Sequence, residues 1–205
     1  MDTRSFPTKG NLILAKNSLA LARQGYELMD KKRNILIREL MSLIEQAKDV
    51  QEEIDSTFTQ GYQCLQRANI EHGISFVSEL AYTVPIEESI QIQVRSIMGT
   101  EIPHVKYDDK ANQLTYSFHT TKESIDIARE AFRLVKELTI RLAQLENSAY
   151  RLAANIKKTQ KRANALKNIT IPTYEALVYN ISNALEEKER EEFTRLKVIK
   201  KMHAK

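Results

Sequence analysis

The sequence predicts a mainly α-helical protein whose long N- and C-terminal helices pair as an antiparallel coiled coil, with a small hairpin-containing insert between them. Apolar residues recur at heptad spacing in both halves of the chain, which is typical of a coiled-coil seam. Only 5 Gly and 4 Pro occur among 205 residues, so few turns can be built and the elements must be long. A short central segment alternates polar and apolar residues, as half-buried strands do.

These patterns divide the chain into three parts. Residues 1–82 are expected to form the first long helix of the shaft, and residues 121–205 the second. Residues 83–120 are expected to form a small α/β insert with a hairpin, because Pro85 interrupts the first helical pattern.

The first helix is predicted from two series of residues that step by seven. One runs from Leu12 to Ile54 and the other from Ala15 to Val50, and nearly all their positions are apolar, with Arg33 the single charged one. Gly61 falls on a core position further along. It either allows close approach of the two backbones or marks a locally weak helix, which costs roughly 1 kcal/mol relative to Ala.

The second helix is predicted from a matching pair of series that begin at Val135 and Leu138. Near Pro172 the rhythm changes to three successive steps of four, which locally unwinds a left-handed supercoil. Proline inside a helical pattern also bends or ends a helix. Both signals predict a kink near Pro172.

The residues expected in the shaft core occupy the heptad positions of both helices: Leu12, Leu19, Met29, Leu36, Leu40, Leu43, Val50, Ile54, Val135, Leu138, Leu142, Leu145, Leu152, Ile156 and Leu166.

The insert is predicted to contain strands at residues 89–95 and 113–119, where apolar side chains occupy every second position. Residues 105–107, followed by the turn-forming residues 108–112, suggest a hairpin return into the strand at 113–119. The apolar strand residues are Ile90, Ile92, Val94, Leu114, Tyr116 and Phe118. Two helices joined by such an insert pair antiparallel, which suits a spacer, a lever or a shaft.

No catalytic, cofactor or metal site is expected. The five glycines lie too far apart to form a phosphate-binding loop, and no two of the four histidines have the spacing of a metal site. Cys64 is interpreted as a small packed side chain. A lone cysteine also fits a reducing compartment. No apolar run exceeds four residues, so no membrane insertion is expected.

The charge distribution points to a binding surface. Residues 151–168 contain six basic residues and no acidic one, whereas residues 86–109 carry a net charge of −3. A basic stripe binds nucleic acid, an anionic membrane or an acidic protein, or it is merely solvated. Nucleic acid is disfavoured because stacking aromatics and recognisable modules are missing. The candidate partner-facing residues are cationic: Lys31, Lys32, Arg33, Lys157, Lys158, Lys161, Arg162, Arg190 and Arg195.

Several strings resemble the D subunit of V/A-type ion-translocating ATPases over nearly the full chain. Residues 7–9 and 19–33 (PTK and LALARQGYELMDKKR) are similar to the opening of that family, and residues 98–103 (MGTEIP) to its middle motif. Residues 161–172 (KRANALKNITIP) and 185–192 (LEEKEREE) follow its late pattern almost step for step. The sequence departs from the family at Met29, Asp30 and Lys167.

The resemblance implies a central-stalk rotor subunit that is not itself an enzyme, binds no cofactor, and couples nucleotide turnover to rotation of the membrane ring. Its implied partners are the nucleotide-binding A and B subunits of the head, the small F subunit of the stalk and the socket subunit above the ring. The implied location is the cytoplasmic face of the membrane, as a peripheral part of the complex. The alternatives are a coiled-coil adaptor or tether and, less favoured, a basic rod that binds nucleic acid.

Overall fold

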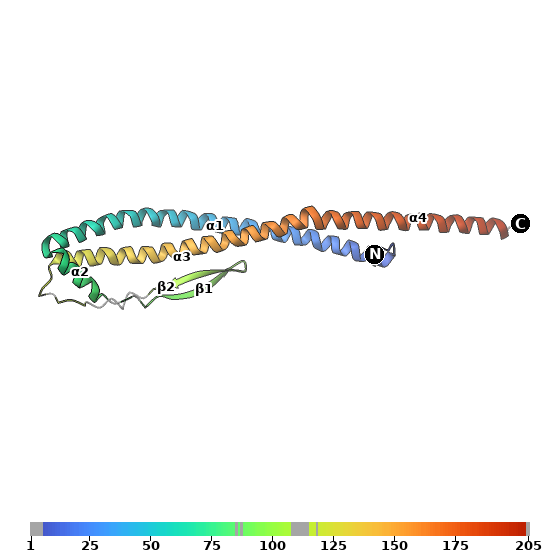
Figure 1. Ribbon diagram of the computed structural model, residues 1–205. Coiled ribbons are helices and arrows are strands. Elements are labelled where there is room, and N and C mark those ends of the chain that lie inside the picture. The colour runs from blue at the N-terminus through green and yellow to red at the C-terminus, as the bar shows by residue number, and fades with distance from the viewer. Residues whose placement is uncertain (1–5, 85, 87, 108–114, 118, 204–205) are drawn as a thin grey trace. The chain divides into compact units, whose positions relative to one another are not determined.

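A computed structural model describes residues 6–84, 86, 88–107, 115–117 and 119–203 (Figure 1). Most of the chain is helical, and a single π-helical turn, η3, interrupts the C-terminal half. The helical elements are α1 (Lys9–His72), α2 (Ile74–Thr83), α3 (Glu123–Ala165), η3 (Leu166–Thr170) and α4 (Ile171–His203). An antiparallel pair of strands, β1 (Gln91–Ile97) and β2 (Thr100–Lys106), lies between α2 and α3 in the chain. The predicted class, two long terminal helical segments with a small central β insert, is therefore confirmed.

The chain divides into two compact units. The terminal unit holds the described residues up to Asn34 together with those from Lys157 onward. Its helices run antiparallel: Lys9 Nζ lies 3.1 Å from Glu189 Oε1, and Arg23 Nη2 lies 2.7 Å from Glu175 Oε1. The start of α1 is thus paired with the later part of α4.

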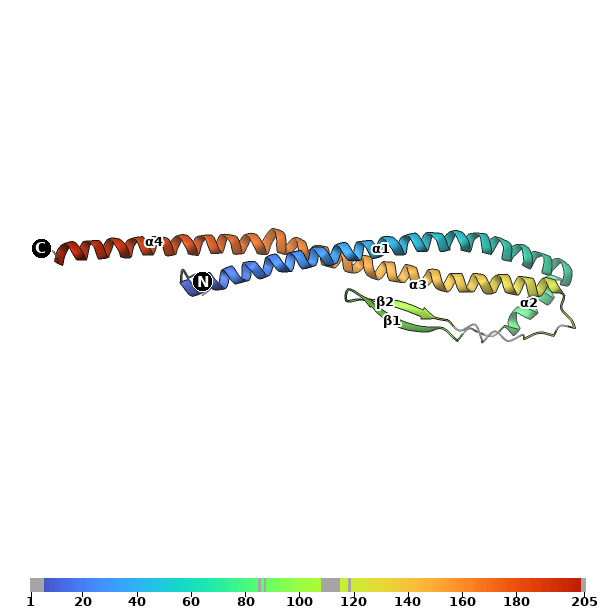
Figure 2. The ribbon, with the colours of Figure 1, turned by 180° about the vertical axis from the view of Figure 1, so that it is seen from behind.

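The central unit holds residues 35–156 and consists of the rest of α1, α2, the hairpin and most of α3. Here too the long helices run antiparallel, as the views in Figures 1 and 2 agree. Near the end of α1, the Ser124 hydroxyl of α3 donates a 2.7 Å hydrogen bond to the carboxylate of Glu71.

The first helix is shorter than the sequence predicts. It ends at His72 because Gly73 takes a positive φ of 88°, which glycine adopts without steric cost, and the separate helix α2 follows. Gly61, by contrast, lies inside α1 and is buried. A Cβ there would meet the Phe132 ring at 3.7 Å, so the glycine lets that ring pack directly against the α1 backbone.

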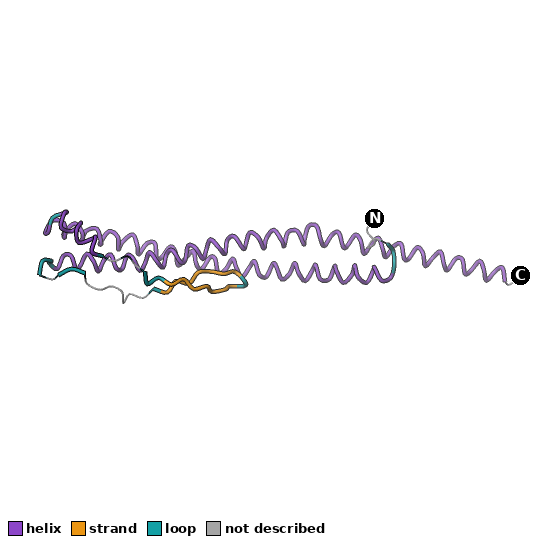
Figure 3. Tube along the Cα trace, turned by 60° about the horizontal axis from the view of Figure 1, so that its bottom comes forward, coloured by secondary structure: helices purple, strands orange, loops and turns teal. Residues whose placement is uncertain are grey.

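The hairpin of the structure pairs other segments than the predicted one (Figure 3). The segment 89–95 corresponds to β1, with Ile92 and Val94 in the strand and Ile90 just before it. Its partner is β2, of which the prediction marked only the end, at residues 105–107, and the chain turns at Met98-Gly99. The predicted turn at 108–112 lies outside the described residues, as do Leu114 and Phe118, and Tyr116 of the predicted strand lies in a bend. Most of β2 was missed because Pro103 interrupts its pattern and proline is unusual within strands.

The turn itself is a tight two-residue connection. Met98 and Gly99 both have positive φ, 49° and 73°, which is the requirement of a type I′ hairpin turn. Asparagine is favoured at the first of these positions, whereas an ordinary side chain such as methionine is strained there.

We therefore expect Met98→Asn to stabilise the chain, by about 0.5–1 kcal/mol. Met98 is 44% exposed, so little packing is lost with its side chain. The measurement is thermal unfolding of the full-length chain. Met98→Ala is the control, because it also removes the side chain but keeps the strain. A melting temperature for Met98→Asn no higher than that of Met98→Ala would contradict this account of the turn.

The second long helix continues through Pro172. The π-helical turn η3 lies directly before it, and the Ile171 N–H donates to the Leu166 carbonyl, five residues back. Proline lacks an N–H and clashes with the carbonyl four residues earlier, and the wider turn accommodates this defect. Beside it Lys167 Nζ lies 5.9 Å from the Tyr26 ring centroid, whereas Arg23 pairs with Glu175.

Candidate interaction site: the seam, its polar layer and the docked hairpin

The predicted core residues lie along the contact between the helices, and none of them is exposed. The buried ones are Leu36, Val50, Ile54, Val135, Leu138, Leu145 and Leu152. The half-buried ones are Leu12, Leu19, Met29, Leu40, Leu43, Leu142, Ile156 and Leu166. In the central unit they gather into two clusters, one built from Val50, Ile54, Leu138 and Leu145, the other around Leu36 and Leu152. Apolar burial at about 25 cal/mol per Å² makes these clusters the main source of cohesion.

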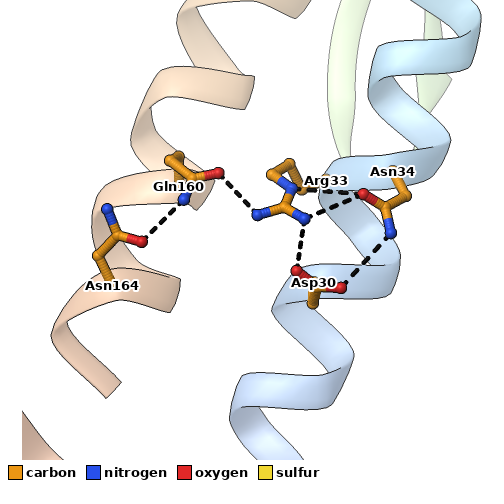
Figure 4. Close-up of polar contacts among 5 residues, drawn as sticks. All are labelled: Asp30, Arg33, Asn34, Gln160 and Asn164. Atoms are coloured by element: carbon orange, nitrogen blue, oxygen red, sulfur yellow. Dashed lines mark hydrogen bonds and ion pairs between the residues drawn. The ribbon is translucent and has the colours of Figure 1, made fainter. Parts of the chain in front are cut away.

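The seam of the terminal unit contains a polar layer centred on Arg33 (Figure 4). Its guanidinium donates a 2.8 Å hydrogen bond to Gln160 Oε1 on α3 and lies 2.6 Å from Asp30 Oδ1. Asn34 accepts from the same guanidinium, and Gln160 in turn donates to Asn164 at 2.8 Å. These contacts explain a charged residue at a seam position. A polar layer in a coiled coil specifies register at some cost in stability.

We expect Arg33→Leu to lower the melting temperature of the chain and to weaken its register. Removing one partner of a partly buried ion pair is destabilising, because the other partner is left without its counter-charge. Here the Asp30 carboxylate loses its cation and Gln160 Oε1 loses its donor. Spin labels at positions 23 and 175 would give one narrow distance distribution in the parent chain and a broadened or split one in the variant.

The control for this experiment is Lys31→Leu, which removes the same charge at an exposed position two residues away. It should leave both the melting temperature and the distance distribution nearly unchanged. An Arg33→Leu chain with a single distance as narrow as that of the parent would show that the polar layer does not set the register.

The hairpin is attached to α3 through the outer edge of β2. Gln144 Oε1 accepts the Val105 N–H at 2.8 Å, and Arg151 donates to the Glu101 carbonyl at 3.3 Å. The Asn155 amide donates to the Thr100 hydroxyl, and the buried Ser148 hydroxyl lies 3.5 Å from the Pro103 carbonyl. These four side chains recur every three or four residues, so they share one face of α3. They form hydrogen bonds with groups on the outer edge of β2, which would otherwise be an open sheet edge.

One face of the hairpin completes the attachment. Ile102 is buried against Leu36 and Leu152, and Ile97 packs on the same cluster. The sequence reasoning did not identify these contacts. The signal available was the polar set Gln144, Ser148, Arg151 and Asn155, whose spacing matches a second helical stripe beside the apolar seam.

The cationic residues of the terminal unit fall into two groups. Lys157, Lys158, Lys161 and Arg162 are exposed on one face of α3, and within the described part of the chain no ion pair involves them. Lys31, Arg190 and Arg195 are also exposed, whereas Lys32 is half-buried. Arg195 lies 3.9 Å from Glu191. Arg33 differs from the rest, since it is half-buried and its guanidinium is bonded to Asp30 and Gln160 within the polar layer.

An open apolar cavity of about 380 Å³ lies in the central unit among α1, α2 and α3, lined by residues such as Leu65, Leu80 and Phe132. Tyr116 stands at its wall and donates a hydrogen bond to Asp126, with the Arg129 guanidinium over its ring. Burial raises the pKa of the Tyr116 hydroxyl, and the bond to Asp126 raises it further. The phenol therefore stays protonated and serves as a structural donor.

Neither metal-binding nor membrane-spanning features stand out in the described ranges. Among those residues, no group of three His, Cys, Asp or Glu side chains could hold a metal ion. In the same residues, no helix has a stretch long and apolar enough to cross a bilayer. Cys64 is half-buried within α1 and is not in a disulfide. What the arrangement offers chemically is therefore a packed seam, a fixed hairpin and charged surfaces.

Comparison with known proteins gives a consistent result. The model of the family described as the D subunit of ATP synthase matches residues 11–201. The V-type ATP synthase D subunit of Thermotoga neapolitana is 44% identical over 199 residues, covering 97% of this chain and 98% of the relative. The A-type ATP synthase D subunits of Pyrococcus horikoshii and Pyrococcus abyssi are 36% and 35% identical, each over 95% of this chain and 92% of the relative.

Proposed function

Because this chain belongs to the family of ATP synthase D subunits, we propose that it is the central-stalk rotor subunit of a V/A-type ion-translocating ATPase. In this role it couples nucleotide turnover in the head of the complex to rotation of the membrane ring. The chain itself is not catalytic. It acts as a peripheral part of the complex on the cytoplasmic face of the membrane.

The observation that carries this proposal is the antiparallel seam in both units. A rotor must transmit torque without unfolding, and a close-packed pair of helices resists deformation as protein interiors do. An asymmetric shaft contacts each nucleotide-binding interface of the surrounding head differently. Rotation of the shaft therefore changes which interface is closed, and this differential contact is what coupling between distant sites requires.

The partners follow from the same proposal. The nucleotide-binding A and B subunits would surround the helical pair, and the small F subunit and the socket subunit would bind the central part of the chain. The exposed cations Lys157, Lys158, Lys161 and Arg162 suit acidic rims on the head. Such rim charges mainly steer association, since each exposed ion pair contributes only about 0–1 kcal/mol.

The test is a single-molecule rotation experiment on the assembled complex. The head is immobilised, and a visible probe is attached to this chain through Gln93→Cys in a Cys64→Ala background. Stepwise rotation that depends on ATP is expected. A probe on a head subunit is the control and should stay fixed. If the chain assembles and ATP is hydrolysed but its probe does not turn, the chain is a static tether and not a rotor.

A second measurement addresses the non-catalytic role. The purified chain alone should show no saturable ATP binding at micromolar concentration, because no phosphate-binding loop is present in its sequence. Saturable binding or hydrolysis by the isolated chain would contradict this part of the proposal.

A further inference from the structure

The hairpin carries its apolar side chains on the face that does not pack on the helices. In a strand, alternate residues point to opposite faces, and cross-strand partners share a face. The register pairs Ile92 with Val105 and Val94 with Pro103, so these four residues form one apolar face, here called the outer face. Ile97 and Ile102 belong to the opposite face and pack on the helices.

The exposure of the outer face is unusual for a two-stranded sheet. Ile92 is 71% exposed and Val94 is 63% exposed, and Ile90, just before β1, is 41% exposed. The polar residues Gln91 and Gln93, in contrast, alternate with them on the other side of the strand. A sheet normally buries its apolar face against another layer of structure. This hairpin leaves the β1 half of its outer face open, whereas Pro103 and Val105 on β2 are half-buried and Ile97 and Ile102 of the other face pack on the helices.

The charges around the hairpin are also unevenly distributed. The cationic residues Arg95 and Lys106 belong to the helix-side face. Glu101 belongs to the outer face, and the exposed Glu88 lies shortly before β1. The outer face therefore combines apolar residues on both strands with one acidic residue, Glu101, whose backbone carbonyl accepts a hydrogen bond from Arg151 of α3. This carboxylate would repel acidic groups on an approaching partner and attract basic groups.

We propose that the outer face binds an amphipathic helix of another subunit of the ATPase complex, with an apolar stripe and basic flanking residues. Neighbouring strands lie about 5 Å apart and next-but-one residues of a strand about 7 Å apart, so the four apolar residues form a patch small enough for one helix to cover. An apolar helix stripe at positions i, i+3, i+4 and i+7 covers such a surface. This inference rests on the proposed function, since it requires the chain to be part of a complex.

The first experiment measures incorporation by competition. The subunits of the complex are co-expressed with two differently tagged full-length chains, one parental and one carrying Ile92→Thr with Val94→Thr. Threonine keeps the β-branched shape of the side chain and removes its apolar contact. We expect the purified complex to contain the parental chain in excess, on the order of tenfold, because threonine gives up part of the apolar burial that would hold the two subunits together.

The control is Gln91→Thr with Gln93→Thr, at two exposed positions on the other face of the same strand. This variant should enter the complex as well as the parental chain. Both double variants should melt as the parental chain does when isolated. If even the parental chain is missing from the complex, the proposed function fails. If the parental chain is present and the Ile92 and Val94 variant competes equally, this inference alone fails.

A second experiment identifies the partner. A photo-crosslinking benzoylphenylalanine replaces Ile92 in the full-length chain, and the assembled complex is irradiated. The expected adduct joins it to a helical segment of another subunit with Lys or Arg beside the attachment point. An adduct to a second copy of this chain, to an extended strand or to an acidic segment would overturn the proposal, as would the absence of any adduct.

Discussion

Leu152→Asp is expected to abolish the cooperative folding of the central unit. Leu152 is fully buried, with 0% of its surface exposed, and packs in one cluster with Leu36 and Ile102. A carboxylate there has no partner, so the substitution costs several kcal/mol whether it stays charged or takes up a proton. Since whole domains are stable by only about 5–15 kcal/mol, the chain should lose most of its helicity at a much lower temperature.

Function should fail together with folding. In the reconstituted complex, the Leu152→Asp chain should support little ion transport driven by ATP, although the nucleotide-binding subunits are unchanged. Ala153→Asp is the matched control, because Ala153 is exposed on the same helix, and aspartate costs only about 0.5 kcal/mol in helix propensity there. Normal unfolding and full coupling by the Leu152 variant would rule out both the seam and the stiff-shaft account.

Ile102→Asp is expected to release the hairpin from the helices while leaving most of the helical content intact. Ile102 is 7% exposed and is the strand residue that enters the cluster of Leu36 and Leu152. The substitution removes the apolar part of the attachment and places a carboxylate in the cluster, which costs several kcal/mol as long as the hairpin stays attached. The remaining polar contacts to α3, each worth about 0.5–1.5 kcal/mol, are too weak to compensate.

The measurement is amide hydrogen exchange at Val105, whose N–H is bonded to Gln144 in the attached hairpin. Exchange should accelerate by orders of magnitude in the Ile102 variant. His104→Asp is the control, because His104 lies on the same strand and the same face but is exposed. Equal protection of the Val105 amide in both variants would mean that the edge contacts alone hold the hairpin.

Sequence periodicity predicted the helical seam well, because burial imposes the same 3–4 spacing along the whole length of each helix. It placed an irregularity near Pro172, but it could not distinguish a kink from a π-helical turn. That choice depends on how the carbonyl groups around the proline are accommodated, and the sequence pattern does not record it. The end of α1 at Gly73 was missed for a similar reason, since one glycine interrupts a helix only when its φ turns positive.

The interaction surfaces were harder to predict than the core. Arg33 was expected to face a partner because it is charged, but its neighbours Asp30 and Gln160 hold it within the seam. Most of β2 was not predicted as a strand, since strand pairing depends on contacts between distant residues rather than on local alternation. The apolar residues of β1 were recognised, but their alternation alone could not indicate which face would be left open.

The end of α4 determines where proteases should first cut the isolated chain. Lys9 of α1 pairs with Glu189, and every described residue of α4 from Glu186 to His203 is exposed. The last 14 or so residues of that helix thus lie beyond the reach of α1. A lone helix of roughly this length is only marginally stable in water. Proteases need an unfolded stretch to cut, so the free chain should be trimmed from this end first, and the cleaved bonds would mark where pairing with α1 stops.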